Sequence, residues 1–276
     1  GDDFEHLGFH ISPDVDTLTY TLAEVANTDT GWGRGGETWQ FIETFGALGG
    51  ETWFRLGDRD LAVHVHRRNL LEAGSTLTEA TAEIASRLGI AHPILPMSDD
   101  PVRTIVHTPD GPLAFQHYFV RDRCEPVVTG FEFAGVAEAA LNPRIDFSDL
   151  DGVVICPSNP FVSVDPVLAV PGMREALVAS GGPIVAVSPI VGGIAIKGPT
   201  AKMMAELDVP ATTVQVAEHY RELLTGFVVD EQDADQRGAV EAMGMAADVR
   251  QSVMVTLADR IQLAENVLDF VSTLER

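Results

Sequence analysis

The sequence predicts an α/β fold in which helices flank a mostly parallel sheet and a smaller β-rich segment is inserted. Three observations support this fold class. Short apolar runs alternate with helical patterns after residue 150, each run ends in polar or turn-forming residues, and the chain closes with a long amphipathic helical pattern. This alternation is typical of βαβ units around a parallel sheet. We expect strands at residues 152–156, 183–187 and 227–229.

Three helices are predicted from the spacing of apolar residues. Residues 77–88 have one apolar face and stop at Gly89. Pro171 suits the first turn of a helix that passes Leu177 and stops before Gly181. The last helix carries an apolar stripe that we expect to cover one face of the sheet. The stripe consists of Leu257, Ile261, Ala264, Leu268 and Val271.

The residue pattern of the inserted segment predicts β-strands. Residues 104–108 and 113–120 flank the turn signal Pro109-Asp110-Gly111-Pro112, and residues 127–133 can add a third strand. We therefore expect three parts: an N-terminal part of the core with functional loops at 1–96, a β-rich insert at 97–145, and a C-terminal part of the core at 146–276.

Composition excludes several classes of protein. The 18 Lys and Arg residues against 41 Asp and Glu residues give a net charge of -23, and the basic residues do not cluster. Such a chain repels nucleic acids and anionic membranes. No apolar run is long enough for a membrane-spanning helix, and no signal segment is evident. We expect a cytoplasmic protein that binds neither nucleic acid nor membrane.

An acidic motif lies near the N-terminus. Asp2 and Asp3 open the chain, and Asp14 and Asp16 alternate just before an apolar run. Alternate carboxylates in an extended loop point to one side, and two carboxylates from neighbouring loops suit a hard cation such as Mg²⁺. The alternative interpretation is a helix N-terminus, where Asp is favoured, with Asp16 or Thr17 as the cap.

All three tryptophans lie in two glycine- and arginine-containing segments, residues 31–39 and 53–60. Flat rings beside arginines suit a planar heteroaromatic ligand. The alternative is a pair of tryptophans that only pack a loop. For Asp58 and Asp60, which precede an apolar helical run, the alternative is a helix cap.

The loops after the later strands offer groups that can bind phosphate. Ser158 and Asn159 follow the first of these strands, Ser188 follows the second, and Lys197 lies nearby in a glycine-containing loop. Ligands of open α/β sheets bind at these strand ends, although ordinary turn chemistry also explains the composition. Because no nucleophile elbow, Walker loop or GxGxxG motif occurs, metal-assisted group transfer fits better than covalent catalysis.

Taken in order over nearly the whole chain, these motifs resemble the 2-phospho-L-lactate transferase family. The matching segments are Gly1-Asp2-Asp3, Pro13-Asp14-Val15-Asp16-Thr17, Gly31-Trp32-Gly33, Glu37-Thr38-Trp39, the run 53–62, Pro157-Ser158-Asn159-Pro160 and Ser188-Pro189-Ile190. The resemblance implies a Rossmann-like core, a homodimer and Mg²⁺. It also implies transfer of a phospholactyl group from a guanosine diphosphate-linked donor to the deazaflavin Fo, with release of GMP, in coenzyme F420 biosynthesis. A related donor with an enolpyruvyl or glyceryl group is an open alternative.

The resemblance also assigns roles to residues. It makes Asp2 and Asp16 the Mg²⁺ ligands and catalytic residues, with Asp3 and Asp14 behind them. It places Asp16, Arg55 and Arg59 beside the deazaflavin, and Ser158, Asn159, Ser188 and Lys197 toward the guanosine diphosphate part. We also expect Trp32 and Asp58 to bind substrate.

The sequence departs from the family pattern at its start. The family normally begins with a strand and a glycine-rich loop, whereas this sequence begins at Gly1 without an initiator methionine. We therefore expect the natural chain to begin upstream. The alternative function is a nucleotide-sugar-binding regulator of the gluconeogenesis-factor type. Such relatives carry a Gly- and Ser-rich stretch after the paired aspartates, where this chain has Phe4-Glu5-His6-Leu7-Gly8.

Overall fold

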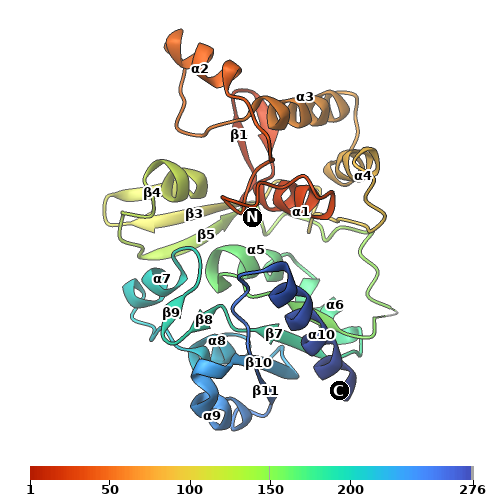
Figure 1. Cartoon of the computed structure of the whole chain (residues 1–276), viewed down its shortest axis with the longest axis vertical. Helices are drawn as coiled ribbons and strands as arrows, with labels where there is room; N and C mark the ends of the chain where they lie inside the picture. Colours follow the sequence, from red (N-terminus) through yellow and green to blue (C-terminus); the bar gives the residue numbers. More distant parts are fainter. Residues whose placement is uncertain (149, 275–276) are drawn as a thin grey trace. The chain divides into compact units, whose positions relative to one another are not determined.

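The computed structural model of the chain describes residues 1–148 and 150–274. The chain divides into two compact units, which contain the elements labelled in Figure 1. Unit 1 comprises Gly1–Val106, Gly111–Pro126 and Glu132–Ile145, and unit 2 comprises His107–Asp110, Val127–Phe131 and Asp146–Arg276. Across the described residues, no helix combines the length and the apolar character needed to cross a bilayer.

Unit 1 begins with a hairpin that packs on a group of helices. The antiparallel strands β1 (Phe4–His6) and β2 (Phe9–Ile11) lead into α1 (Pro13–Leu22). The remaining helices are α2 (Gln40–Ala47), α3 (Asp58–Glu72) and α4 (Leu77–Arg87). Helix α4 confirms the prediction at 77–88, and a capping box between Thr76 and Glu79 fixes its start. Tyr20, Val63 and Ile84 join α1, α3 and α4 in one apolar cluster.

A three-stranded sheet follows, with the order β4-β3-β5. Its strands are β3 (Arg103–Thr108), β4 (Gly111–Ala114) and β5 (Gly130–Ala134). The predicted strand at 113–120 is wrong beyond Ala114, because the chain forms a π-helix, η1 (His117–Arg121). A short apolar run does not distinguish a strand from a buried helical turn.

Unit 2 contains a parallel sheet with the order β11-β10-β7-β6. The strands β6 (Val153–Ile155), β7 (Ile184–Val187) and β10 (Gly226–Asp230) confirm the three predicted runs. The fourth, β11 (Ala246–Arg250), was not predicted. Every residue of β7 and β10 is buried, as expected for the central strands of a parallel sheet.

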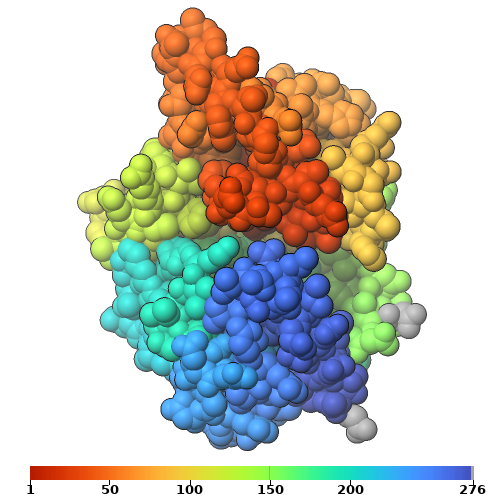
Figure 2. Space-filling model, in the orientation of Figure 1, coloured from red at the N-terminus to blue at the C-terminus, as the bar shows by residue number. Residues whose placement is uncertain are grey.

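Helix α10 (Leu257–Thr273) exists as predicted, but most of the predicted core stripe is wrong. Leu263, Val267 and Val271 are buried, and they pack on valines of β7 and β10. Leu257 and Leu268, which were expected in the core, are 70% and 62% exposed. The helix carries two apolar stripes that meet at Val271, and only the one formed by Leu263, Val267 and Val271 covers the sheet. In Figure 2 the dark blue segment at the surface is this C-terminal part of the chain.

Short helices and hairpins connect the strands of unit 2. Pro171 lies outside the helix it was expected to begin, because Gly172, with a φ of 87°, precedes the first helical residue. The connecting elements are η2 (Pro160–Val164), α5 (Asp165–Leu168), α6 (Met173–Ala179), β8 (Ile190–Val191), β9 (Ile194–Ala195), α7 (Thr200–Glu206), α8 (Thr213–His219), η3 (Glu231–Gln236) and α9 (Arg237–Glu241).

Candidate active site

The first residues of the chain lie in the interior of unit 1. The carbonyl of Gly1 accepts a hydrogen bond from the backbone of Thr104 on β3, at 2.9 Å. Asp2 follows with only 6% of its surface exposed. The amide of Gln116, which is also buried, lies 3.4 Å from Oδ2 of Asp2 and 3.4 Å from its carbonyl oxygen. A carboxylate is therefore held inside unit 1 between β1 and the end of β4.

Asp2 is paired with Asp14 at the start of α1. The carboxyl of Asp14 shares a hydrogen bond with that of Asp2, and the backbone of Asp14 donates another. Burial, followed by the charges of Asp14 and Asp3, raises the pKa of Asp2 well above its usual value. Burial likewise raises the pKa of Asp14. Because their pKa values are raised, the two carboxyls together favour binding a proton. A cation bound between them could take the place of that proton.

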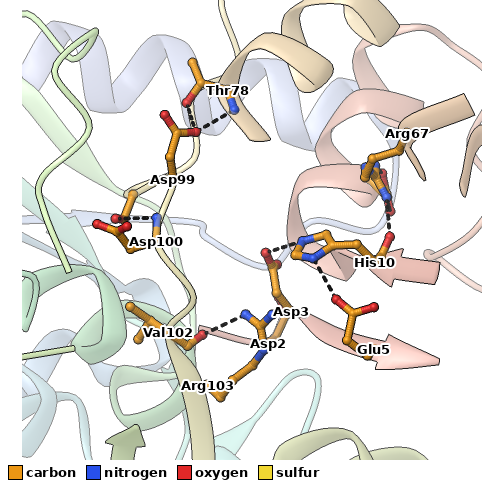
Figure 3. A network of polar contacts seen from close by, with 12 residues as sticks. Asp2, Asp3, Glu5, His10, Arg67, Thr78, Asp99, Asp100, Val102 and Arg103 are labelled. Carbon is orange, nitrogen blue, oxygen red and sulfur yellow. Dashed lines mark hydrogen bonds and ion pairs between the residues drawn. The ribbon is translucent and has the colours of Figure 1, made fainter. Parts of the chain in front are cut away.

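Asp3 is held by a histidine from the next strand. His10 places Nε2 3.1 Å from Asp3 and Nδ1 3.2 Å from Glu5, its partner residue across the hairpin (Figure 3). Burial would raise the pKa of Asp3, but the hydrogen bond to His10 and nearby positive charges lower it overall. Asp3 is therefore stabilised in its charged form beside the Asp2–Asp14 pair.

Asp16 lies in a different environment from Asp14. The expectation of an extended loop is wrong here, because α1 begins at Pro13 and residues two apart on a helix point in different directions. The alternative of a helix N-terminus with acidic residues in its first turn is confirmed, but Asp16 and Thr17 are not its cap, because Ser12 holds the N-cap position. The carboxylate of Asp16 forms a two-point ion pair with Arg67, whose side chain is 1% exposed. Arg67 also donates to the carbonyl of His10, which Figure 3 shows.

The Asp16–Arg67 pair continues into a buried polar network. Nδ1 of His64 lies 3.2 Å from Arg67, and Nε2 of His64 lies 3.3 Å from Asp60. The hydroxyl of Tyr20 donates to the same Asp60 carboxylate. Burial, and then the charges of Asp16 and Asp60, raise the pKa of Tyr20. The network joins α1 to α3, and it leaves Nε of Arg67 and Nε2 of His64 buried without a hydrogen bond.

The predicted substrate residue Asp58 lies at the junction of two helices that cap each other. Its carboxylate accepts hydrogen bonds from the Thr38 hydroxyl and from the backbone of Gln40 and Phe41, at the start of α2. In return, Glu37 accepts from the first backbone amides of α3, at residues 59 and 60, with distances of 2.8 and 2.9 Å. The expectation that Asp58 or Asp60 caps the helix that follows is wrong, because α3 already begins at Asp58 with Gly57 as its N-cap; Asp58 instead binds the backbone at the start of α2.

The predicted deazaflavin residues Arg55, Arg59 and Trp32 are all exposed. The guanidinium of Arg55 stacks on the ring of Trp39, with Cζ 4.2 Å from the ring centroid. Arg59 approaches the carbonyl of Gly35 at 3.5 Å. Trp32, at 59% exposure, lies at the tip of a closed loop. Arg55 is thus already paired with a flat ring, whereas Trp32 presents a free ring face.

An aromatic cluster lies next to the acidic residues. Phe4, on β1 directly after Asp3, packs against Phe54 with a centroid distance of 4.9 Å. Trp53 packs edge-to-face against His6 at 5.1 Å and against His117 at 4.8 Å. Since His117 follows Gln116, the cluster and Asp2 are joined through neighbouring residues of one segment.

Unit 2 contains the residues predicted to bind the guanosine diphosphate part of the donor. Asn159 caps η2 by accepting from the backbone of Phe161 at 3.0 Å, and Ser158 before it is half-buried. Ser188 is buried, with its hydroxyl bonded to Thr213 and to the carbonyl of Ile190. Its side chain therefore fixes a turn.

Lys197 has a different environment from Ser188. It is exposed after the β8–β9 hairpin, and no ion pair to it occurs within the part of the chain that the structure describes. Of the donor-side residues, Lys197 has the side chain with the most freedom to meet a ligand.

Sequence reasoning missed Arg67, His10 and Gln116. Arg67 has a detectable signal, because it follows the buried Val63 by one helical turn on α3 and so lies on the inner face. His10 and Gln116 gave no such signal, since their partners are set by strand pairing and by a contact 114 residues apart in sequence.

Comparison with known proteins agrees with these motifs. A family model described as 2-phospho-L-lactate transferase CofD matches residues 1–261. A 2-phospho-L-lactate transferase of Methanosarcina acetivorans is 39% identical over 265 residues, which cover 95% of this chain and 86% of the relative. The chain belongs to the 2-phospho-L-lactate transferase family.

Family membership makes the chain a transferase. Its relatives differ in the group named as transferred. A phosphoenolpyruvate transferase of Streptomyces coelicolor is 38% identical over 276 residues, 97% of this chain and 86% of the relative. The identities to the 2-phospho-L-lactate transferase and to the phosphoenolpyruvate transferase are therefore nearly equal, and overall identity does not distinguish between the two named groups.

A solved structure of much lower sequence identity shares the fold. A protein from Bacillus halodurans matches with a TM-score of 0.57 and 13% identity, covering 91% of this chain and 82% of that protein. At this identity the likeness supports the α/β architecture alone.

Proposed function

We propose that the protein is a Mg²⁺-dependent transferase that moves a phospholactyl, enolpyruvyl-phosphate or phosphoglyceryl group from a guanosine diphosphate-linked donor to the deazaflavin Fo, releasing GMP, in coenzyme F420 biosynthesis. Family membership supports the reaction class. The observation that carries the proposal in this chain is the hydrogen-bonded pair of carboxyls formed by Asp2, which is buried, and Asp14, which is exposed at the start of α1.

The carboxylate oxygens of Asp2 and Asp14 are ligands of the kind that Mg²⁺ prefers. Mg²⁺ prefers oxygen ligands and commonly uses one or two carboxylates together with waters and substrate phosphates. Among the described residues, no three His, Cys, Asp or Glu side chains gather as a metal site. The residues that would hold the ion are Asp2 and Asp14, in place of the Asp2 and Asp16 expected from the resemblance, because Arg67 already binds both oxygens of Asp16. A bound cation would offset the negative charge of the diphosphate.

Asp16 has a positioning role in this proposal. Its ion pair with Arg67 already occupies both of its oxygens. That arrangement suits a fixed acceptor for a ligand hydroxyl more than a general base. We propose that Asp16 and Arg59, both implied by the resemblance, border the acceptor.

The acceptor ring has two aromatic surfaces available in unit 1. One is the exposed ring of Trp32, and the other is the cluster around Trp53 beside the acidic pair. Planar heteroaromatic ligands bind to such surfaces through stacking. The proximity of the Trp53 cluster to Asp2, through Phe4 and Gln116, supports an acceptor whose hydroxyl chain reaches the carboxylates.

The terminal hydroxyl oxygen of the ribityl chain bonds to the β-phosphorus of the donor, and the bond from that phosphorus to the oxygen bridging it to the α-phosphate breaks, so that GMP leaves. The hydroxyl proton passes to an aspartate carboxylate of the acidic group. The chain contributes positioning and charge stabilisation, which dominate catalysis of phosphoryl transfer.

The first test is a fluorescence titration with Fo, with and without Mg²⁺ and GDP. Saturable Fo binding that strengthens with Mg²⁺ and GDP is the expected result, and assays with the lactyl, enolpyruvyl and glyceryl donors then identify the transferred group. Asp14→Asn should lose the Mg²⁺ effect while it keeps the fold. Absence of Fo binding by folded protein would contradict the proposal.

We also propose that the protein acts in the cytoplasm as a homodimer. The cytoplasmic location is the expectation from the sequence, and the homodimer is what the resemblance implies. Light scattering on the purified protein measures the mass directly, and a monomer at micromolar concentration would contradict the dimer.

A further inference from the structure

Gln116 is a buried residue that the proposed reaction leaves without a role. It is 5% exposed and directs its side-chain amide to Asp2, at 3.4 Å from both Oδ2 and the carbonyl oxygen. The amide therefore donates to one carboxylate oxygen and to the backbone of the same residue. Asp2 cannot rotate its carboxylate without losing one of these contacts.

The contact engages one named oxygen of Asp2. Oδ2 faces the amide of Gln116, and the same carboxyl also interacts with Asp14. Carboxylates that bind cations are commonly hydrogen-bonded by such outer partners, which fix their orientation and tune their affinity. An amide is suited to this task because it donates without adding charge to a crowded acidic group.

The position of Gln116 in the fold supports a functional role. It directly precedes η1, a single-turn π-helix, and helices of this kind are rare and often occur at functional sites. The next residue, His117, contacts Trp53 of the aromatic cluster. One short segment thus touches both the acidic pair and the rings beside it.

We propose that Gln116 is a positioning residue that orients Asp2 for a divalent cation bound between Asp2 and Asp14. This inference rests on the cation site of the proposed function. It assigns to Gln116 a role that acts through Asp2, without contact with the transferred group.

The test measures binding of Mn²⁺ alone, by electron paramagnetic resonance titration of the protein without substrates. Gln116→Leu keeps the side-chain volume and removes the hydrogen-bond donor to Asp2. It should weaken Mn²⁺ binding about tenfold. Gln116→Glu replaces the hydrogen-bond donor with a carboxylate beside Asp2 and Asp14. It should tighten Mn²⁺ binding, and it should lower the melting temperature of the protein when a chelator keeps it metal-free. Gln262→Leu, on the exposed face of α10, is the matched control and should bind as the wild type does.

The outcomes separate the two proposals. A purely structural Gln116 would lower the melting temperature in both variants and leave Mn²⁺ affinity unchanged, which would overturn the positioning role and leave the cation site intact. A wild-type protein that binds no Mn²⁺ would overturn the cation site itself. Opposite shifts in affinity for the Leu and Glu variants are the result that supports the inference.

Discussion

Arg67 and Asp16 form a two-point ion pair inside unit 1, and less than a tenth of either side chain is exposed. Removing one member of a buried pair leaves an uncompensated charge in the interior. The same arginine also binds the backbone of β2, so it connects α1, α3 and the hairpin that leads from Asp2. Asp16 is consequently part of the structural support of the site.

This arrangement predicts that Asp16→Ala destabilises the protein in addition to any effect on turnover. The expected loss is about 3–5 kcal/mol of unfolding free energy, because Arg67 stays buried without its partner. Urea denaturation of the variant measures the loss. The double variant Asp16→Ala with Arg67→Met should be more stable than Asp16→Ala alone, and equal stability of the two would contradict the ion-pair explanation.

The close approach of Gly57 to Glu37 predicts a second effect. A Cβ at position 57 would lie 2.3 Å from the side chain of Glu37, which caps α3. Gly57→Ala should therefore displace the cap and cost about 1–2 kcal/mol. In a Glu37→Ala background the same substitution should cost much less, since the clash is absent. A full thermodynamic cycle by chemical denaturation tests this, and additive effects would rule out the contact as the cause.

Asp230 predicts a pH dependence in unit 2. Burial would raise the pKa of its carboxyl, but hydrogen bonds from the backbone of Gln232 and from the backbone and hydroxyl of Ser252 lower it overall. A lowered pKa in the folded state gives stabilisation that is complete above the ordinary value of 3.8 and is lost as the pH falls through the folded value.

The measurement compares Asp230→Asn with the wild type. The difference in unfolding free energy should be constant above about pH 5 and should shrink as the solution becomes more acidic than the ordinary carboxyl value. A difference that grows with acidity would have the wrong sign and would refute the stabilised carboxylate.

The two apolar stripes of α10 should differ in how much stability is lost when one of their side chains is truncated to alanine. Leu263→Ala removes a buried side chain that packs on the sheet and should cost about 2–5 kcal/mol. Leu257→Ala removes a side chain that is 70% exposed and should change stability by less than about 0.5 kcal/mol. Thermal and chemical denaturation of the two variants compares them directly. Equal losses would show that the stripe containing Leu257 is covered in solution.

The sequence predicted much of unit 2 because its strands are uninterrupted apolar runs bounded by turn residues. The face that α10 buries was not predictable in the same way. Leu257, Ile261 and Leu268 are spaced as regularly as Leu263 and Val267, and only contact with β7 and β10 selects between the stripes. Periodicity indicates that a helix is amphipathic, while tertiary contacts decide which of two apolar faces is inside.

The candidate site shows a similar limit. The acidic residues were found from their spacing, but their pairing depends on where α1 begins. With a helix from Pro13 onward, Asp14 meets Asp2 while Asp16 turns to Arg67. The long-range partners Arg67 and Gln116 have no local motif, so only the folded arrangement identifies them.

The mutual capping of α2 and α3 has a consequence for variation in chain length. Hydrogen bonds of Glu37 and Asp58 hold the two ends of the segment 37–58 together. The segment is therefore a closed loop that is fixed at its base. Insertions or deletions near its outer turn, at residues 48–51, can be absorbed without moving either anchor. A single residue added between Glu37 and Gln40, or between Gly57 and Asp60, would break both caps at once. The tip of this loop is therefore the place in unit 1 where a tag or a label can be introduced with least disturbance to the acidic site.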